Sequence, residues 1–352
     1  MKIMRYELAR AIDKVRGVVQ KNDQIPALSG VLVENGYITA SNHEITMEVK
    51  LEASGDTPFI LPMRAFDLIR NMPEGEMEIT VNDKNIVTIR MDKIQNSYRS
   101  HPVDEFMYKK EAPEEDGVWL PGKDFIEALS RVAFAAADKT YDMMGGIHLR
   151  TEGGRLNIVA LNGHVAAWDT ITAEGMADMS LIIPKPAVKK LIDMDMDDDI
   201  ELSADKTSAV FRIGENVIFS RLIDGKYYNY RAMFKDGKAG ELEVDRKAFA
   251  AALTRAKLCC TEEKQPVILT VGQGRIQMKV ADSLTNYAED LPAETDFEEP
   301  LRIGFDSKMM LEALRTFREG QIRMRFMGQK APAFITEKDS NLTVLVLPVV
   351  IR

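Results

Sequence analysis

The chain has 352 residues, of which 45% are hydrophobic and 29% are charged, a composition that excludes disordered and fibrous proteins. Because a domain takes roughly 100–200 residues, this length predicts two or three domains, each able to bury a core. The 46 basic and 55 acidic residues give a net charge of −9, which argues against a protein that coats nucleic acid or anionic membrane with its whole surface.

Signals for secretion and membrane insertion are missing from the sequence. No apolar run approaches the roughly 20 residues that span a bilayer, and the first seven residues are too charged to begin a signal peptide. The only cysteines, Cys259 and Cys260, are adjacent, so they form neither a spaced disulfide framework nor a CxxC pair. We therefore expect a cytoplasmic protein with reduced thiols.

The first predicted element is an amphipathic helix over residues 5–19, in which Leu8, Ile12 and Val15 recur on one face. Alternating strands follow on either side of Gly36. A second helix is predicted over residues 63–71, and a strand with period-two alternation follows it.

The same order of elements returns twice along the chain. Gly36, Gly154 and Gly274 begin equivalent strands and are spaced by 118 and 120 residues, close to one third of the chain. Four more helices are predicted at 123–138, 185–193, 245–258 and 307–319. The prediction is an α+β protein with three repeated domains, each holding two helix-plus-strand units.

Two stretches have the composition of linkers between these domains. Residues 110–117 are acidic and contain Pro and Gly, and residues 235–240 contain two glycines. We place the domains at 1–117, 118–240 and 241–352.

The six predicted helices hold 18 basic and 10 acidic residues, a net charge of +8, which leaves −17 on the rest of the chain. Arg10 and Lys14 lie opposite the apolar face of the first helix, as Lys247 and Arg255 do in the fifth. On one helix such residues indicate only a solvated face. Repeated on six equivalent helices, they predict a positive track that contacts phosphates without reading bases.

No motif of catalytic or metal chemistry stands out. Nucleophile elbows, Walker loops and HExxH are absent, and none of the four histidines is spaced to share a metal. The acidic run 193–199 lacks the Gly and Glu of a calcium loop and is interpreted as a solvated helix-to-strand connection. His164, in a turn after a strand, is either a surface residue or one wall of a binding groove. We predict no catalytic residue, metal or cofactor.

Several segments, taken in order on this threefold repeat, resemble the bacterial sliding clamp family, the beta subunit of DNA polymerase III. They are IPALSGV (25–31), RVAFA (131–135), IVALNGH (158–164), SRLIDGKYYNYR (220–231) and VLVLP (344–348). The resemblance covers the whole chain. It implies three clamp-type domains and a head-to-tail homodimer that closes a six-domain ring, with helices lining the hole and strands outside.

The resemblance also implies a function in DNA replication. The ring would encircle duplex DNA without sequence preference, as a non-catalytic processivity factor. Basic inner helices would face the DNA, and we infer the DNA-facing positions to be Arg10, Lys14, Lys21, Lys139 and Lys247.

A hydrophobic groove between the second and third domains is implied as the binding site for linear motifs of the replicative polymerase, clamp loader and repair proteins. The matching positions are Met144, Leu161, Gly163, His164, Tyr228, Met233, Asp306, Met309, Leu345, Val346, Leu347 and Pro348. Apolar residues predominate among them, as a groove for apolar anchors requires. The chain departs from the family at Tyr228, where proline is usual, at Ala232, where arginine is common, and in the turn 162–166 and the last four residues.

For the dimer interface, Phe106 matches a family position in the first domain, and Leu258 and Cys259 match an aliphatic pair in the third.

Three alternatives remain at this point. The first is a clamp-fold peptide-binding scaffold that does not encircle DNA, against which the basic helices argue. The second is a hydrolase or metal enzyme using His164 with the acidic run. A trimeric clamp of two-domain chains is disfavoured, because this chain carries six helix-plus-strand units rather than four.

Overall fold

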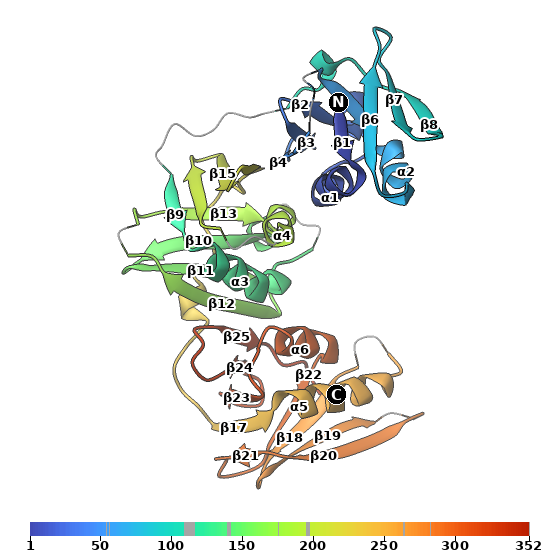
Figure 1. Ribbon diagram of the computed structural model, residues 1–352. Coiled ribbons are helices and arrows are strands. Elements are labelled where there is room, and N and C mark those ends of the chain that lie inside the picture. Colours follow the sequence, from blue (N-terminus) through green and yellow to red (C-terminus); the bar gives the residue numbers. More distant parts are fainter. Residues whose placement is uncertain are drawn as a thin grey trace. The chain divides into compact units, whose positions relative to one another are not determined.

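One supersecondary unit, a strand and a helix followed by three antiparallel strands, recurs six times along the chain (Figure 1). The computed structural model describes residues 1–53, 55, 57–108, 117–138, 142–174, 176–194, 198–262, 265–281 and 283–351. These residues form two compact units: residues 1–123 with 186–224 (unit 1), and residues 124–185 with 225–352 (unit 2).

All six predicted helices are confirmed, although three of them, at 5–19, 123–138 and 307–319, end earlier than the apolar pattern suggests. They are α1 (Arg5–Val15), α2 (Phe66–Asn71), α3 (Gly122–Val132), α4 (Lys185–Asp193), α5 (Arg246–Leu258) and α6 (Ser307–Leu314). Val132 leads into a 3₁₀ turn over Ala133–Ala135, which tightens the end of α3. Leu8, Ile12 and Val15 of α1 are all fully buried, as the period of the sequence predicts.

The strands follow the threefold order. The first third contains β1 (Lys2–Met4), β2 (Gly30–Glu34), β3 (Tyr37–Ser41), β4 (Ile45–Lys50), β5 (Phe59–Pro62), β6 (Glu76–Val81), β7 (Ile86–Met91) and β8 (Ile94–Arg99). The second contains β9 (Val118–Leu120), β10 (Gly146–Glu152), β11 (Arg155–Leu161), β12 (Val165–Thr172), β13 (Ser180–Pro184), β14 (Ile200–Ala204), β15 (Ser208–Ile213) and β16 (Asn216–Arg221). The third contains β17 (Gly240–Asp245), β18 (Val267–Gly272), β19 (Arg275–Ala281), β20 (Asn286–Pro292), β21 (Glu294–Thr295), β22 (Leu301–Phe305), β23 (Gln321–Phe326), β24 (Ala333–Thr336) and β25 (Thr343–Val346).

Equivalent turns connect the equivalent hairpins. Asn35-Gly36, Gly153-Gly154 and Gln273-Gly274 all have positive φ at both residues, the conformation of a tight two-residue hairpin. The three glycines that mark the repeat in the sequence therefore occupy the same left-handed turn position, where a side chain is unfavourable.

Two strand pairs join consecutive thirds of the chain into continuous antiparallel sheets. In unit 1, β4 pairs with β16, and the eight-stranded sheet runs β5-β2-β3-β4-β16-β15-β14-β9. In unit 2, β12 pairs with β25 within a nine-stranded sheet. Two four-stranded sheets end in β8 and in β20, which have no further neighbour among the described strands.

Candidate functional site

The main candidate site is an apolar cavity of about 420 Å³ in unit 2, within the range of ligand-binding pockets. Eight of the predicted groove residues line it: Met144, Leu161, Gly163, His164, Tyr228, Met233, Leu345 and Leu347. The fold therefore brings together residues of the second and third thirds of the chain, as the resemblance implies.

A side-chain-capped turn shapes one wall of the cavity. The Asn162 Oδ1 accepts hydrogen bonds from the backbone N–H groups of His164 (3.0 Å) and Val165 (3.1 Å), which closes the turn between β11 and β12. Gly163 has φ +83° within it. The backbone N–H of Leu347 then donates to the carbonyl of His164 at 2.9 Å, so the turn is tied to the end of β25.

Aromatic stacking holds the segment that carries Tyr228. The preceding residue, Tyr227, is buried and stacks on His148 of β10 with ring centroids 4.6 Å apart. Tyr230 packs edge-on against Trp168 of β12 at 5.3 Å. Burial, followed by the nearby Arg150 charge, lowers the pKa of His148 to about 4, so this histidine is neutral near pH 7.

Asp306 and Met309 lie instead in an adjoining, more polar cavity of about 660 Å³ in the same unit, which shares Val165 with the first. Asp306 caps α6, because its Oδ1 accepts from the backbone N–H groups of Lys308 (2.8 Å) and Met309 (3.1 Å). Its carboxylate is thus partly used in holding the helix.

The structure does not bring Val346 or Pro348 to either cavity. Val346 is 1% exposed between Leu345 and Leu347, both of which line the apolar cavity. Successive residues of a strand point to opposite faces, so three consecutive residues cannot all face one groove. The prediction for Val346 is corrected accordingly.

Six residues of the apolar cavity were not among the predicted positions. They are Val165, Ala166, Ala232, Lys235, Met327 and Pro332. Val165 and Ala166 belong to the turn 162–166 singled out in the sequence and could have been found from it. Met327 and Pro332 reach the cavity from the turn between β23 and β24, and no local sequence pattern indicates that approach.

The predicted DNA-facing residues lie on or beside helices. Arg10 on α1 and Lys247 on α5 are exposed, and Lys14 is half-buried. Lys21 follows α1 and lies 3.2 Å from Asp23, so part of its charge is neutralised. Lys139 falls outside the described residues.

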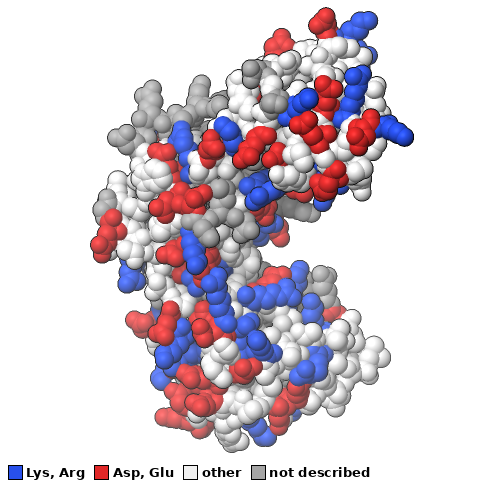
Figure 2. Space-filling view, in the orientation of Figure 1, with Lys and Arg blue, Asp and Glu red and all other residues white. Residues whose placement is uncertain are grey.

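The six helices carry 14 basic and seven acidic side chains, in a chain whose net charge is −9. Several of these charges pair locally: Arg70 lies 3.4 Å from Asp13, and Asp67 lies 3.0 Å from Arg16, which directly follows α1. Figure 2 shows basic and acidic side chains interspersed on the visible face of each unit. The described helices therefore carry a positive excess in a chain that is acidic as a whole.

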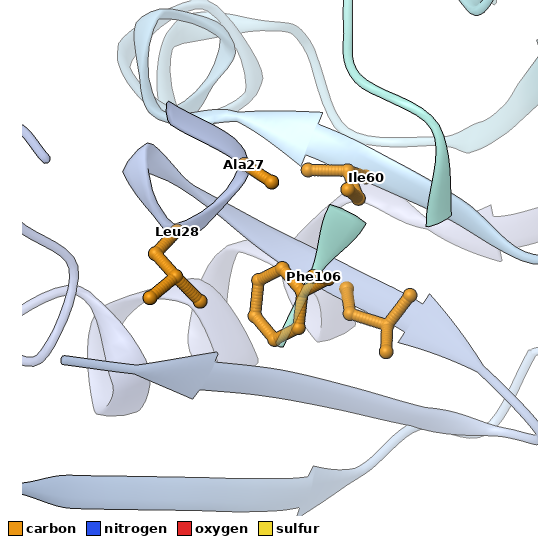
Figure 3. Packing of buried hydrophobic residues seen from close by; sticks show 5 residues of the cluster. Ala27, Leu28, Ile60 and Phe106 are labelled. Atoms are coloured by element: carbon orange, nitrogen blue, oxygen red, sulfur yellow. The ribbon is translucent and has the colours of Figure 1, made fainter. Parts of the chain in front are cut away.

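Of the predicted interface residues, Phe106 is buried within unit 1 and Leu258 is exposed. Phe106 packs against Ala27, Leu28 and Ile60 and is 5% exposed (Figure 3). This placement gives it a role in the chain's own core and leaves little of its ring for a second chain. Leu258, at the end of α5, is 82% exposed, and the neighbouring Cys259 is half-buried.

In the described part of the chain, no cluster of three or more His, Cys, Asp or Glu side chains is arranged to hold a metal ion. No helix in the same residues is long and apolar enough to cross a membrane. The acidic run 193–199 is described only at its two ends, between α4 and β14.

Comparison with known proteins gives a consistent result along the chain. Sequence models of the DNA polymerase III beta subunit match its N-terminal domain to residues 1–108, its central domain to 119–229 and its C-terminal domain to 231–350. The beta sliding clamp of Bacillus subtilis is 24% identical over 374 residues, covering 99% of this chain and 98% of that protein.

Solved structures have the same fold. A sliding clamp from Pseudomonas aeruginosa, bound to griselimycin, superimposes with a TM-score of 0.92 at 21% identity and covers 100% of this chain and 99% of its own. The beta subunit from Streptococcus pyogenes gives 0.91 at 20% identity, covering 99% of each chain.

Proposed function

Because the chain belongs to the DNA polymerase III beta subunit family, we propose that it is a DNA sliding clamp, a processivity factor that encircles duplex DNA and tethers the replicative polymerase. The proposed role is mechanical, and no catalytic step is assigned to the chain. We also propose that it acts in the cytoplasm, with domain boundaries near residues 117 and 240.

The observation that carries this proposal is the repetition of the strand pairs that join the thirds. Each third of the chain holds two helix-plus-strand repeats. The first repeat ends in β4, β12 and β20 in the three thirds, and the second repeat ends in β8, β16 and β25. Within the chain β4 pairs with β16, and β12 pairs with β25. The one combination left over is β20 with β8, which are the two sheet edges.

Repeating the same pairing between two chains gives a closed assembly. β20 of one chain would pair with β8 of a second, and β8 of the first with β20 of the second, so that two chains of three domains form a head-to-tail ring. At the internal joins Ile45, Ile218 and Ser220 are buried. Their counterparts on the two edges, such as Tyr98 and Thr285, are half-exposed, as expected of residues that a second chain would cover.

Sliding would follow from the kind of contact the helices offer. Exposed basic side chains such as Arg10 and Lys247 contact phosphates, which carry no sequence information. A ring held by such contacts cannot leave sideways, yet it can move along the duplex. Partners would bind through short linear motifs in the apolar cavity, whose walls suit apolar side chains.

The decisive experiment measures retention on DNA. The protein is loaded onto nicked circular DNA and onto the same DNA after linearisation, and the salt concentration is then raised. We expect retention on the circle and loss from the free ends of the linear form, because topological linkage does not depend on salt. Equal loss from both, once loading has been confirmed, contradicts the ring and favours the peptide-binding scaffold that does not encircle DNA.

A further inference from the structure

In the third domain, a short strand covers the outer edge of the domain's first strand. β21 pairs antiparallel with β17 there, with Glu243 opposite Glu294 (Figure 1). The backbone N–H of Asp296 donates to the carbonyl of Glu241 at 3.2 Å, so the backbone groups of Glu241 face β21, as do those of Glu243 two residues along. The fold therefore accepts an extended segment as an additional strand at this position.

In the second third, the segment after the equivalent hairpin takes another path. β21 follows β20, but the segment that follows β12 is held on β10: the Thr151 Oγ1 donates to the carbonyl of Ala177 (2.8 Å) and accepts from the backbone N–H of Met179 (2.7 Å). β9 is the last strand of the eight-stranded sheet, and no strand among the described residues pairs with its outer edge. Such an edge is a template for the addition of a strand.

Trp119 marks this open edge of β9. It lies three residues before the first residue of α3, as Glu243 lies three residues before the first residue of α5, so its backbone groups also face the outer edge. Its neighbour Leu120 is 1% exposed and faces the core, so Trp119 points to the opposite face, where it is 65% exposed. The chain's other tryptophan, Trp168, instead donates its indole N–H to the Asn157 Oδ1 at 3.1 Å.

The surroundings of β9 carry an excess of negative charge. Glu201 on β14 lies directly opposite Trp119, and Arg212 Nη1 neutralises part of its charge from 3.7 Å. The exposed Asp198 and Asp199 lie beside the start of α3. Residues 110–123, which include β9, hold four acidic and two basic residues. A basic side chain over Trp119 would gain a cation–π contact with the indole and attraction from these carboxylates.

We propose that the outer edge of β9 binds an extended basic segment of a partner protein, which adds as an antiparallel strand and places a Lys or Arg side chain over Trp119. Basic residues occur at alternate positions of this segment, because alternate side chains of a strand share one face. The residue opposite Trp119 exchanges both backbone hydrogen bonds with it. β9 lies in unit 1 and lines no part of the apolar cavity, so the inference goes beyond the proposed function and is tested separately from it.

The peptide Thr-Lys-Val-Lys-Val-Lys-Val, labelled with fluorescein, tests the proposal by fluorescence anisotropy with the full chain, in about 150 mM salt to screen distant charges. Two further probes carry backbone N-methyl groups on either the three lysines or the three valines. A lysine over Trp119 directs its backbone N–H toward β9, whereas the valine N–H groups point away. We expect lysine methylation to weaken binding about tenfold and valine methylation to leave it unchanged. Equal binding of the two methylated probes overturns strand addition.

Four variants assign the binding to this edge. Trp119→Ala should weaken binding of the unmethylated probe about three- to tenfold, and Trp119→Phe should retain part of the affinity. Glu201→Gln should also weaken it. Glu243→Gln is the matched control, because it removes the same charge beside a paired arginine, on an edge that β21 already covers. Equal losses in the two glutamate variants reveal a general attraction to an acidic surface and overturn the site, as does an unchanged affinity in Trp119→Ala or a failure of the unmethylated probe to bind.

Discussion

Arg131 and Asp169 form the most deeply buried ion pair described in unit 2. The Asp169 carboxylate is fully buried, and Arg131 Nη2 lies 2.6 Å from its Oδ2. The contact is mainly electrostatic, since Oδ2 has no hydrogen-bond partner of good geometry in the described residues. Burial raises the pKa of Asp169 above its ordinary value, and the Arg131 charge and the hydrogen bond from the Thr170 backbone N–H oppose this rise.

We predict that Arg131→Met lowers the free energy of unfolding by about 3–5 kcal/mol, because it leaves a buried carboxylate uncompensated. Urea unfolding at pH 7 measures the change. Arg275→Met is the control, since Arg275 pairs with Asp290 at a half-exposed site, where the loss should stay below about 1 kcal/mol. Adding Asp169→Leu to Arg131→Met should recover part of the stability. Equal losses in the two single variants contradict the prediction.

His148 gives unit 2 a stability that depends on pH. Its pKa is about 4 in the folded chain and about 6.5 when unfolded, so below pH 6.5 the unfolded chain takes up a proton that the folded chain excludes. Stability therefore falls as the pH drops from 6.5 toward 4. Between pH 7 and pH 5 the loss from this group should be about 2 kcal/mol.

The variant His148→Leu should show less of this fall, because leucine does not titrate. Leucine also occupies the equivalent place in the first third, where Leu32 pairs with Ile60 as His148 pairs with Ile182. Urea midpoints at pH 7, 6 and 5 provide the measurement. His101→Gln, which replaces a half-exposed histidine, should show the same change in urea midpoint with pH as the unmodified protein. If the urea midpoint of His148→Leu falls with pH as steeply as that of the unmodified protein, another group is responsible for the fall.

At the scale of elements, the repeated hairpins explain why the threefold organisation could be predicted from sequence. The glycines mark turns whose backbone excludes side chains, and helix and strand periods are local patterns, so both can be found without the structure. The groove was harder to predict, because its wall combines strand ends with a turn far along the chain. Val346 was assigned to the groove although strand alternation turns it away, and Met327 and Lys235 had no local signal at all.

The third hairpin provides a test of this turn geometry. Gly274 has φ +75°, and a Cβ there would meet nothing within 4 Å, so Gly274→Ala adds backbone strain without a clash. We predict a loss of about 1 kcal/mol on thermal or urea unfolding, and a smaller loss for Gly274→Asn. Gly320→Ala is the control, because its backbone is ordinary and its nearest contact would be at 3.9 Å. A neutral Gly274→Ala would argue against a strained turn.

At the scale of the whole molecule, the proposed ring predicts which residues face each other across two chains. In β4 and β16, Thr46 pairs with Phe219. The ladder positions that correspond to these two residues are Asn286 in β20 and Ser97 in β8. We therefore expect Asn286 of one chain to lie opposite Ser97 of the other.

Cysteines at these two positions should crosslink. Antiparallel partners have Cα atoms within disulfide range, so the double variant Ser97→Cys/Asn286→Cys should give a covalent dimer on a non-reducing gel. The native Cys259 and Cys260 are first replaced by serine. Moving one cysteine two residues along, in Gln95→Cys/Asn286→Cys, provides the matched control and should crosslink poorly. Crosslinking only in the shifted pair would exclude the proposed register.

The charge on the helices predicts a salt-dependent contribution to DNA binding. Arg10→Gln and Lys247→Gln should each weaken binding to duplex DNA of any sequence and reduce the salt slope by about 1 for each phosphate contact removed. Titrations between 50 and 200 mM salt, about the range over which such contacts weaken, measure the slope. Arg275→Gln, on a strand, should leave the slope unchanged. Unaltered slopes in both helix variants would place the DNA path elsewhere.

The two internal strand joins have a consequence for how the proposed ring opens. Within one chain, β4 and β16 are tethered, as are β12 and β25, so each pair meets at a high effective concentration that dilution cannot change. The join between β20 and β8 has no tether until the second such join has formed. Each chain of the proposed ring therefore contains two joins that dilution does not break. The join between β20 and β8 forms between chains, depends on the protein concentration, and is the place where DNA would enter the ring.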